Sequence, residues 1–158
     1  MPDWTDLNVI DDVQLRMVAS ENGILEILVR WSGFPEGRHR PENPFLQEAA
    51  RQLRAYFAGE LRDFDLPLDL RGTDFQLQVW HQLQKIPYGE TRSYAEVARV
   101  IERPKAVRAV GAANGANPIS IVVPCHRVIG SSGKLVGYGG GLPLKKKLLG
   151  LESGTLFG

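Results

Sequence analysis

Two short runs of mainly apolar residues near the N-terminus predict β-strands. They span Val13 to Ala19 and Gly23 to Trp31, and the turn residues Glu21-Asn22-Gly23 between them predict a hairpin. After these strands, the spacing of the apolar residues changes to that of a helix. Asn43-Pro44 is a typical helix start, with Asn43 as N-cap, and the helix is expected to end at Gly59. Its apolar face consists of Phe45, Ala49, Leu53, Tyr56 and Phe57.

The second half of the chain has a different pattern. Residues 65–72 are extended and interrupted by a proline, and we interpret them as a connection between domains. A helix is predicted from Thr73 to Lys85, and Pro87-Tyr88-Gly89 ends it. One face of this helix is apolar, through Phe75, Val79, Trp80 and Leu83.

Two further helices are predicted close together. Ser93 and Glu96 form a capping box at the start of a helix that runs to about Ile101. Arg103-Pro104 introduces a second helix, from Lys105 to about Asn114, after a connection of only two or three residues. Such a pair is typical of a helix-turn-helix. The second helix is rich in Ala and Gly, which indicates either close approach to a DNA groove or tight helix packing.

These patterns predict an α/β (α+β) protein. Residues 1–65 would form a small supporting domain with a sheet and a helix. Residues 66–158 would form a mainly helical domain that contains the helix-turn-helix and the single cysteine.

Composition narrows the class of protein. One cysteine in 158 residues excludes an internal disulfide and a four-cysteine zinc site, and a free thiol fits a reducing, cytoplasmic compartment. The start of the chain resembles no secretory signal, and no apolar run approaches the roughly 20 residues of a membrane span. The three histidines are scattered, so we expect no metal site.

Net charge is close to zero but unevenly distributed. Residues 88–128 contain six basic and three acidic side chains, the basic ones being Arg92, Arg99, Arg103, Lys105, Arg108 and Arg127. A local basic surface of this kind fits salt-sensitive contact with phosphates, although an ordinary solvated face is the alternative.

Cys125 is the strongest candidate for chemistry. It follows the apolar run 119–123 and Pro124, which predicts a thiol at the end of a strand, and His126 is its neighbour. An ionised cysteine is a strong nucleophile and a histidine can accept its proton, but a single cysteine can also be a small buried hydrophobic residue.

The run Asn117–Gly130 closely resembles the active-site signature of the O6-alkylguanine-DNA alkyltransferases, the methylated-DNA-protein-cysteine methyltransferases. The likeness continues upstream through residues 93–98 and 105–111, and downstream from Gly137 to Glu152. It therefore covers about residues 73–152.

The resemblance implies a set of catalytic residues. Cys125 would be the alkyl acceptor, losing its proton to His126 through a water, with Glu152 orienting the imidazole and the effective pKa of the thiol lowered. Tyr94 would donate to the purine as it leaves, and Asn117 would brace the site.

The resemblance also implies how DNA is bound. Arg108 would enter the duplex from the minor groove and replace a flipped nucleotide. Other DNA contacts would come from Arg92, Ser93, Lys105, Ala109 and Gly111. The substrate pocket would be formed by Val128, Tyr138, Gly139 and Gly140. Residues 130–134 resemble a phosphate loop with the wrong spacing, and we interpret them as a hairpin turn.

The implied function is irreversible, single-turnover repair of O6-alkylguanine in double-stranded DNA, with O4-alkylthymine as a further candidate substrate. No cofactor and no protein partner are expected, and the protein would be a monomer. The alternatives are a lesion-binding helix-turn-helix protein without catalysis, a transcription factor, and a Cys-His-Glu thiol hydrolase.

Overall fold

The computed structural model describes residues 1–10, 12–130, 133, 138 and 140–154. The chain divides into two compact units. Unit 1 comprises residues 1–71 and 118–120, and unit 2 comprises residues 72–117 and 121–158. No helix among the described residues is long and apolar enough to span a membrane.

Unit 1 contains a four-stranded sheet in the order β3-β2-β1-β4. The strands are β1 (Asp3–Asn8), β2 (Gln14–Ser20), β3 (Gly23–Leu28) and β4 (Arg38–His39). β2 pairs antiparallel with β1 and with β3, so the predicted hairpin is confirmed. β1 was not predicted, because its sequence DWTDLN has few apolar residues and only Leu7 is buried.

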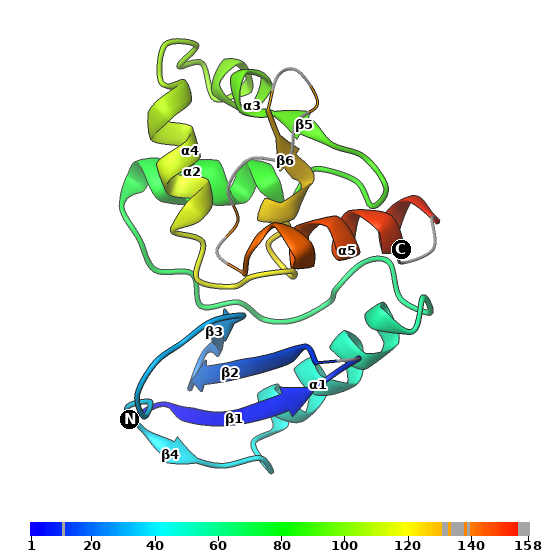
Figure 1. The fold of residues 1–158 in the computed structure, drawn as a ribbon. Helices are drawn as coiled ribbons and strands as arrows, with labels where there is room; N and C mark the ends of the chain where they lie inside the picture. The colour runs from blue at the N-terminus through cyan, green and yellow to red at the C-terminus, as the bar shows by residue number, and fades with distance from the viewer. Residues whose placement is uncertain (11, 131–132, 134–137, 139, 155–158) are drawn as a thin grey trace. The chain divides into compact units, whose positions relative to one another are not determined.

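Helix α1 (Pro44–Phe57) packs against β1, β2 and β3 and closes the core of unit 1 (Figure 1). Its predicted start is confirmed, since the Asn43 side chain accepts hydrogen bonds from the amides of Phe45 and Leu46. Ala58 is the C-cap, and Gly59 follows with φ +77°, a conformation that glycine adopts at no steric cost. Fully buried side chains of this core include Leu15, Met17, Ile24, Ile27, Leu46, Leu53 and Tyr56.

Two extended segments hydrogen-bond to the edge of this sheet at β3. The Ile24 amide donates to the Pro67 carbonyl and the Asp69 amide donates to the Ile24 carbonyl, so residues 67–69 belong to unit 1. The boundary between the units lies after Arg71, whereas the sequence placed it after residue 65. Farther along the chain, Ile119 pairs with Ile27.

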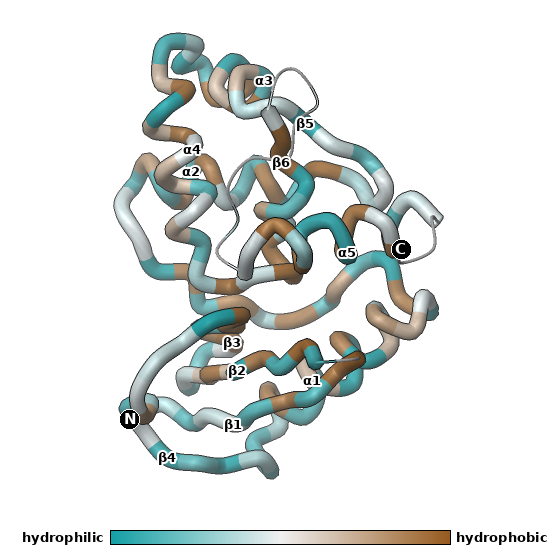
Figure 2. The backbone as a smooth tube through the Cα atoms, viewed as in Figure 1, coloured by the Kyte–Doolittle hydropathy of each residue, from teal (hydrophilic) through white to brown (hydrophobic). Residues whose placement is uncertain are grey.

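Unit 2 is mainly helical and contains α2 (Asp74–Leu83), α3 (Tyr94–Val100), α4 (Val107–Gly115) and α5 (Leu142–Ser153). The capping boxes at Thr73 and Ser93 are both formed, which confirms two of the predicted helix starts. α5 was not predicted. Its apolar positions and its lysines lie side by side in sequence, and both kinds are visible along the helix in Figure 2.

The connection in the helix-turn-helix is longer than predicted. It spans residues 101–106, and α4 begins at Val107, two residues after the predicted start. Ala106 caps the helix without any side-chain hydrogen bond, and Pro104 lies in the connection. Trp80 fixes the other end of α4, since its indole N–H donates to the Ala113 carbonyl at 2.8 Å.

Cys125 does not follow a strand, contrary to the prediction. Ile121 has φ +73° and turns the chain sharply, so the apolar run 119–123 is interrupted after its pairing with β3. Cys125 opens a short 3₁₀ helix (Cys125–Arg127), which leads into β6 (Val128–Ile129). β6 pairs in parallel with β5 (Arg92–Ser93), which directly precedes α3.

Candidate active site

The 3₁₀ turn Cys125–Arg127 presents three consecutive side chains inside unit 2. All three are buried, and the His126 side chain is completely inaccessible. Burial raises the pKa of the Cys125 thiol, while a hydrogen bond from Asn117 and the positive charge of Lys145 act in the opposite direction. The resting thiol is therefore harder to ionise than a free cysteine, which differs from the lowered pKa expected from the sequence.

His126 and Glu152 form a direct hydrogen bond. The distance from His126 Nε2 to Glu152 Oε2 is 2.7 Å, although the two residues lie on the 3₁₀ turn and on α5. Burial lowers the pKa of His126, and the bond to Glu152 raises it less than burial lowers it. The imidazole is thus neutral near pH 7 and able to accept a proton.

Arg127 is the nearest charged partner of Glu152. Its Nε donates to Glu152 Oε1 at 2.7 Å and its Nη2 to Glu152 Oε2 at 3.0 Å, while Nη1 donates to the Ile86 carbonyl. The guanidinium also lies over the Tyr88 ring. Arg127 was counted with the basic surface in the sequence, but it is a buried partner of the site and is not available to phosphates. In the sequence, its position next to His126 was the one feature that could have indicated a place in the site.

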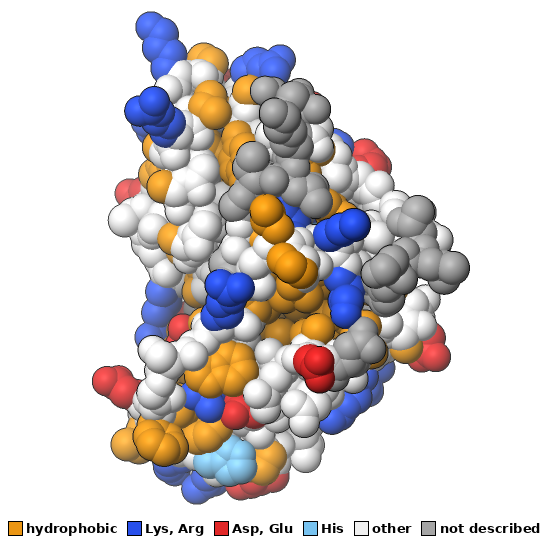
Figure 3. All heavy atoms as spheres, in the orientation of Figure 1, with side chains coloured by type: hydrophobic (Ala, Val, Ile, Leu, Met, Phe, Trp, Pro, Cys, Tyr) orange, Lys and Arg blue, Asp and Glu red, His pale blue; other side chains and the backbone are white. Residues whose placement is uncertain are grey.

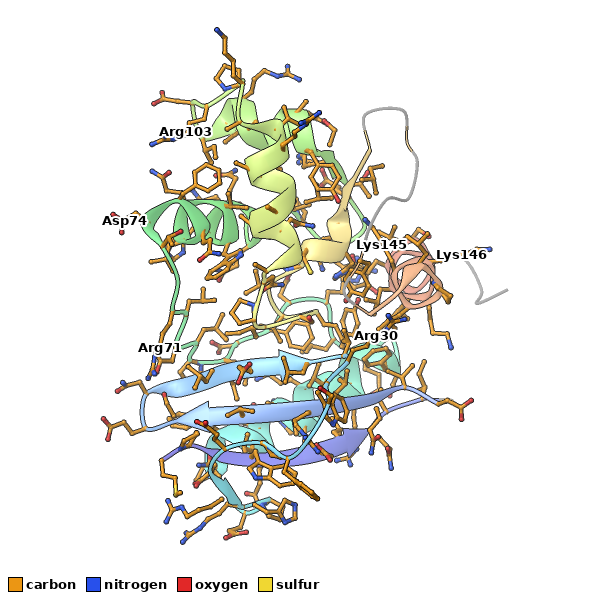
Figure 4. The ribbon with its side chains drawn as sticks, turned by 60° about the vertical axis from the view of Figure 1, so that its left-hand side comes forward. Arg30, Arg71, Asp74, Arg103, Lys145 and Lys146 are labelled. Atoms are coloured by element: carbon orange, nitrogen blue, oxygen red, sulfur yellow. The ribbon has the colours of Figure 1, made fainter. Side chains whose placement is uncertain are left out.

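Lys145 is a second buried cation that sequence reasoning missed. Its side chain is fully buried, and Nζ donates to the Val128 carbonyl at 2.6 Å. Figure 4 shows Lys145 on the side of α5 that faces the Cys125–Ile129 segment, with its exposed neighbour Lys146 on the other side. Burial lowers the pKa of Lys145, and the proximity of Cys125 raises it. Lysine is rarely buried without a hydrogen-bond partner, and the Val128 carbonyl is one for Lys145.

Asparagines from α4 and from the residues just after it bind the active-site backbone. Asn117 Nδ2 donates to the Val123 carbonyl at 2.8 Å, and Asn114 Nδ2 lies 3.3 Å from the Cys125 carbonyl. The Asn114 side chain also hydrogen-bonds to Tyr94, whose pKa is raised mainly by burial and further by the charge of an ionised Cys125. Gly111, one turn before Asn114, faces the Tyr94 ring.

Buried polar atoms without a hydrogen-bond partner gather in this part of unit 2. Among the described residues of unit 2 they are Asn114 Oδ1, His126 Nδ1 and Tyr138 Oη, and the remaining such atom, Asp3 Oδ1, lies in unit 1. The pKa of Tyr138 is raised well above its usual value by burial and by its proximity to Cys125 and Glu152. Such atoms are costly in a folded protein, so their concentration at one place indicates a site that binds a polar ligand.

The predicted DNA contacts lie on the surface around α3 and α4. Lys105, Arg108 and Ala109 are exposed, whereas Arg92 is half-buried and pairs with Glu90 at 3.1 Å. Ser93 caps α3, and Gly111 is half-buried with the Tyr94 ring beside it. Arg108 is the second residue of α4. Basic side chains are visible at this end of unit 2 in Figure 3.

The structure thus brings together Cys125, His126, Glu152, Tyr94 and Asn117, and it adds Asn114, Arg127 and Lys145. Val128 and Tyr138 lie in the same region, since Lys145 binds the Val128 carbonyl and Tyr138 lies near Cys125. Gly139 lies outside the described residues, as do Ser131, Ser132 and Lys134 of the predicted hairpin turn.

Comparison with known proteins agrees with this arrangement. Residues 74–154 match the model of the 6-O-methylguanine DNA methyltransferase DNA binding domain, and residues 10–70 match that of the ribonuclease-like domain of the same family. A methylated-DNA–protein-cysteine methyltransferase from Mycolicibacterium paratuberculosis is 67% identical over 112 residues, covering 70% of this chain and 68% of that protein.

A relative of the same name from Methanosarcina acetivorans is 54% identical, covering 78% of this chain and 85% of that protein. The crystal structure of Mycobacterium tuberculosis OGT in complex with DNA superposes with a TM-score of 0.87 at 48% identity, covering 96% of this chain and 93% of that one. The chain therefore belongs to the 6-O-methylguanine DNA methyltransferase family.

Proposed function

We propose that this protein repairs O6-alkylguanine in double-stranded DNA by transferring the alkyl group to Sγ of Cys125. The observation that supports this most directly is the buried constellation around the only cysteine, with a neutral histidine held by Glu152 beside it. In the reaction an S–C bond forms, the C–O6 bond breaks, and guanine leaves.

The proton of the thiol moves to His126. Nε2 of His126 is engaged by Glu152, so Nδ1, which has no partner among the described residues, is the nitrogen that accepts the proton through a water. Because burial keeps the resting thiol protonated, the cysteine stays unreactive until substrate is bound. Glu152 then stabilises the imidazolium that forms.

Guanine leaves with a developing negative charge on the purine. Tyr94, whose raised pKa keeps its hydroxyl protonated, donates to the purine and reduces that charge. Asn117 holds the chain at Val123 and hydrogen-bonds to the thiol, so it braces the nucleophile. Val128, Tyr138 and Gly140 form the pocket for the flipped base.

DNA is bound by unit 2, and the likeness to an OGT crystallised with DNA supports this. The exposed start of α4 enters the minor groove, where Arg108 takes the place of the flipped nucleotide. Lys105, Arg92, Ser93 and Ala109 contact the backbone beside it, and Gly111 lets α4 pack closely on Tyr94. Unit 1 supports unit 2.

The reaction consumes the protein. A thioether is far more stable than the aryl alkyl ether it replaces, and no described residue offers a way to cleave it. No cofactor is required, because the damaged base is itself the alkyl donor. The protein acts as a cytoplasmic monomer in this proposal, and O4-alkylthymine is a secondary substrate. A non-catalytic lesion-binding protein would not need Cys125 with His126 and Glu152 beside it, and a thiol hydrolase would turn over repeatedly.

Intact-mass measurement after incubation with an O6-methylguanine oligonucleotide tests this function. We expect one methyl group per protein, located on Cys125 by peptide mapping, and no second turnover. Cys125→Ser abolishes transfer but leaves DNA binding largely intact, because the proposed DNA contacts lie in residues 92–111, apart from the cysteine. Repeated turnover, or a methyl group on another residue, would overturn the proposal.

A further inference from the structure

The buried amide of Asn114 binds two parts of the site at once. Asn114 lies on α4, and its Nδ2 donates to the Cys125 carbonyl at 3.3 Å. The same side chain hydrogen-bonds to Tyr94, the first residue of α3. Asn114 therefore links the residue that attacks the alkyl carbon with the residue that assists the leaving purine.

The orientation of this amide is determined by its neighbours. If the amide were turned over, Oδ1 would face the Cys125 carbonyl, and two acceptors would repel each other at 3.3 Å. The bond to Tyr94 lowers the pKa of the phenol, which is the effect of a donor, so Nδ2 donates to the phenol oxygen as well. Oδ1 is buried without a hydrogen-bond partner in the described part of the chain. An unpaired buried acceptor costs about 1–3 kcal/mol, so the two donated bonds are kept at a cost in stability.

A phenol that accepts a hydrogen bond is a better donor through its own proton. The accepted bond draws electron density away from Oη, and hydrogen bonds in a chain strengthen one another in this way. In the proposed reaction guanine leaves with negative charge on the purine, so a stronger donor lowers the barrier. We infer that Asn114 is a positioning residue that holds Tyr94 Oη and strengthens its donation to the departing purine.

Gly111 supports this assignment, because it lies one turn before Asn114 on α4 and borders the same tyrosine. A Cβ placed on Gly111 would lie 3.9 Å from two carbons of the Tyr94 ring, so the ring passes beside the helix at that point. Residues three apart on a helix share a face. The ring lies beside Gly111 and the hydroxyl is bound at Asn114, so α4 determines where the phenol points.

The inference rests on the proposed function, since Tyr94 assists the reaction only if a purine leaves with negative charge. It assigns Asn114 to the leaving-group half of the reaction. Asn117 differs in this respect, because its amide binds the Val123 carbonyl on the side of the nucleophile.

The test compares the free bases O6-methylguanine and O6-methyl-8-azaguanine, in which a nitrogen replaces C8–H. The two bases have the same shape, but the 8-aza ring carries negative charge more readily and needs less help to leave. Free bases are used so that DNA binding does not affect the rates. In Asn114→Leu, which has similar volume and no amide, transfer from O6-methylguanine is expected to slow about tenfold, the effect of one lost hydrogen bond. The 8-aza base is slowed less, so the ratio of its rate constant to that of O6-methylguanine rises.

Tyr94→Phe shows whether this effect passes through the tyrosine. It removes the hydroxyl and is expected to raise the same ratio. Adding Asn114→Leu to Tyr94→Phe then leaves the ratio unchanged, because Asn114 has no hydroxyl to act on. Asn114→Ala removes the same amide and gives the same result, which keeps the test open if the leucine variant does not fold. Gln78→Leu, which removes an exposed amide from α2, is the matched control and keeps the wild-type ratio.

Two outcomes would overturn the inference alone. Equal slowing of both bases in Asn114→Leu and Asn114→Ala would mean that Asn114 only anchors the Cys125 turn. A further rise of the ratio in the double variant would mean that Asn114 acts on the purine without Tyr94. Both outcomes leave methyl transfer to Cys125 intact. If the wild type transferred no methyl group from O6-methylguanine DNA, the proposed function would fall, and the inference with it.

Discussion

Each unit contains an arginine held by a carboxylate through two hydrogen bonds, and the comparison of these pairs shows where the chemistry originates. In unit 1, Arg16 binds Asp6 through Nε at 2.7 Å and Nη2 at 2.9 Å. In unit 2, Arg127 binds Glu152 through Nε at 2.7 Å and Nη2 at 3.0 Å. Both guanidinium groups also donate to a backbone carbonyl and lie near aromatic rings.

The surroundings of the two carboxylates differ. Arg16 lies between the rings of Trp4 and Trp31, 4.7 Å from each centroid, and the Asp6 side chain is 29% exposed. This pair fastens the segment after β3 to the face of the sheet. The Glu152 side chain is only 1% exposed, and His126 is its additional partner.

The same bidentate pair therefore serves two purposes. In unit 1 the ion pair is structural: it lies against two tryptophan rings, and its carboxylate is partly exposed to solvent. In unit 2 it holds a carboxylate in a fixed orientation for a histidine, and the other nitrogen of that histidine is available to the thiol. The ion pair alone performs no chemistry. The additional histidine provides the group that can accept a proton in the second site.

The largest expected effect comes from breaking the pair in unit 2. Arg127→Met leaves Glu152 buried without its cation, which is expected to cost about 3–5 kcal/mol in the free energy of unfolding. Urea denaturation followed by circular dichroism measures this. Arg51→Met, which breaks the exposed bidentate pair with Glu48, is the control and leaves the unfolding midpoint unchanged. Similar losses in the two variants would show that burial of the Arg127 pair is unimportant.

Neutralising each carboxylate in turn tests which of the two ion pairs contributes to the rate of alkyl transfer. Glu152→Gln removes the charge that stabilises the imidazolium, so transfer to Cys125 is expected to slow about 100-fold or more, with the pH profile shifted upward. Asp6→Asn changes the equivalent pair in unit 1 and leaves the rate within about twofold of the wild type. Single-turnover rates of folded protein across pH 6–9 check this, and an unchanged profile in Glu152→Gln would remove Glu152 from the mechanism.

Arg108 extends the comparison to an exposed arginine with no ion pair in the described part of the chain. If it replaces a flipped nucleotide, Arg108→Ala slows repair of a duplex lesion about tenfold, because unstacking the base costs a few kcal/mol. Repair of free O6-methylguanine is hardly affected, and a single-stranded lesion falls between the two. Lys105→Ala, the control, weakens binding to all DNA alike. Equal slowing of free-base and duplex repair by Arg108→Ala would make the arginine a structural residue.

The smallest expected effect is the pH dependence that His126, the histidine bound to Glu152, adds to the free energy of unfolding. The pKa of His126 is lowered by burial, so below about pH 6.5 the unfolded chain binds a proton that the folded protein does not. The free energy of unfolding thus decreases as the pH falls from 7.5 to 5.5, by about 1 kcal/mol for this residue. His126→Gln lacks that contribution, so its pH slope should be smaller than that of the wild type. Parallel slopes would mean that His126 is protonated in the folded protein.

Local sequence determined the hairpin, the capped helices and the identity of the nucleophile. Asn43-Pro44, Thr73 and Ser93 act on amides within three residues, so their effect can be recognised without knowledge of the fold. The signature around Cys125 is local for the same reason. β1 and α5 were missed because each is stabilised by tertiary contacts more than by its own pattern.

Only the tertiary structure decided which of these residues form the site. Arginine is usually a surface residue, but Arg127 is buried because its charge is paired with Glu152 of α5. Lys145 and Lys146 are adjacent and identical, yet one is buried on the Val128 carbonyl and the other faces solvent. The unsatisfied atoms of Asn114 and His126 likewise depend on which groups surround them. A residue's type sets what it can donate or accept, whereas burial and partners, which come from segments distant in sequence, decide whether that capacity is used or left free for a substrate.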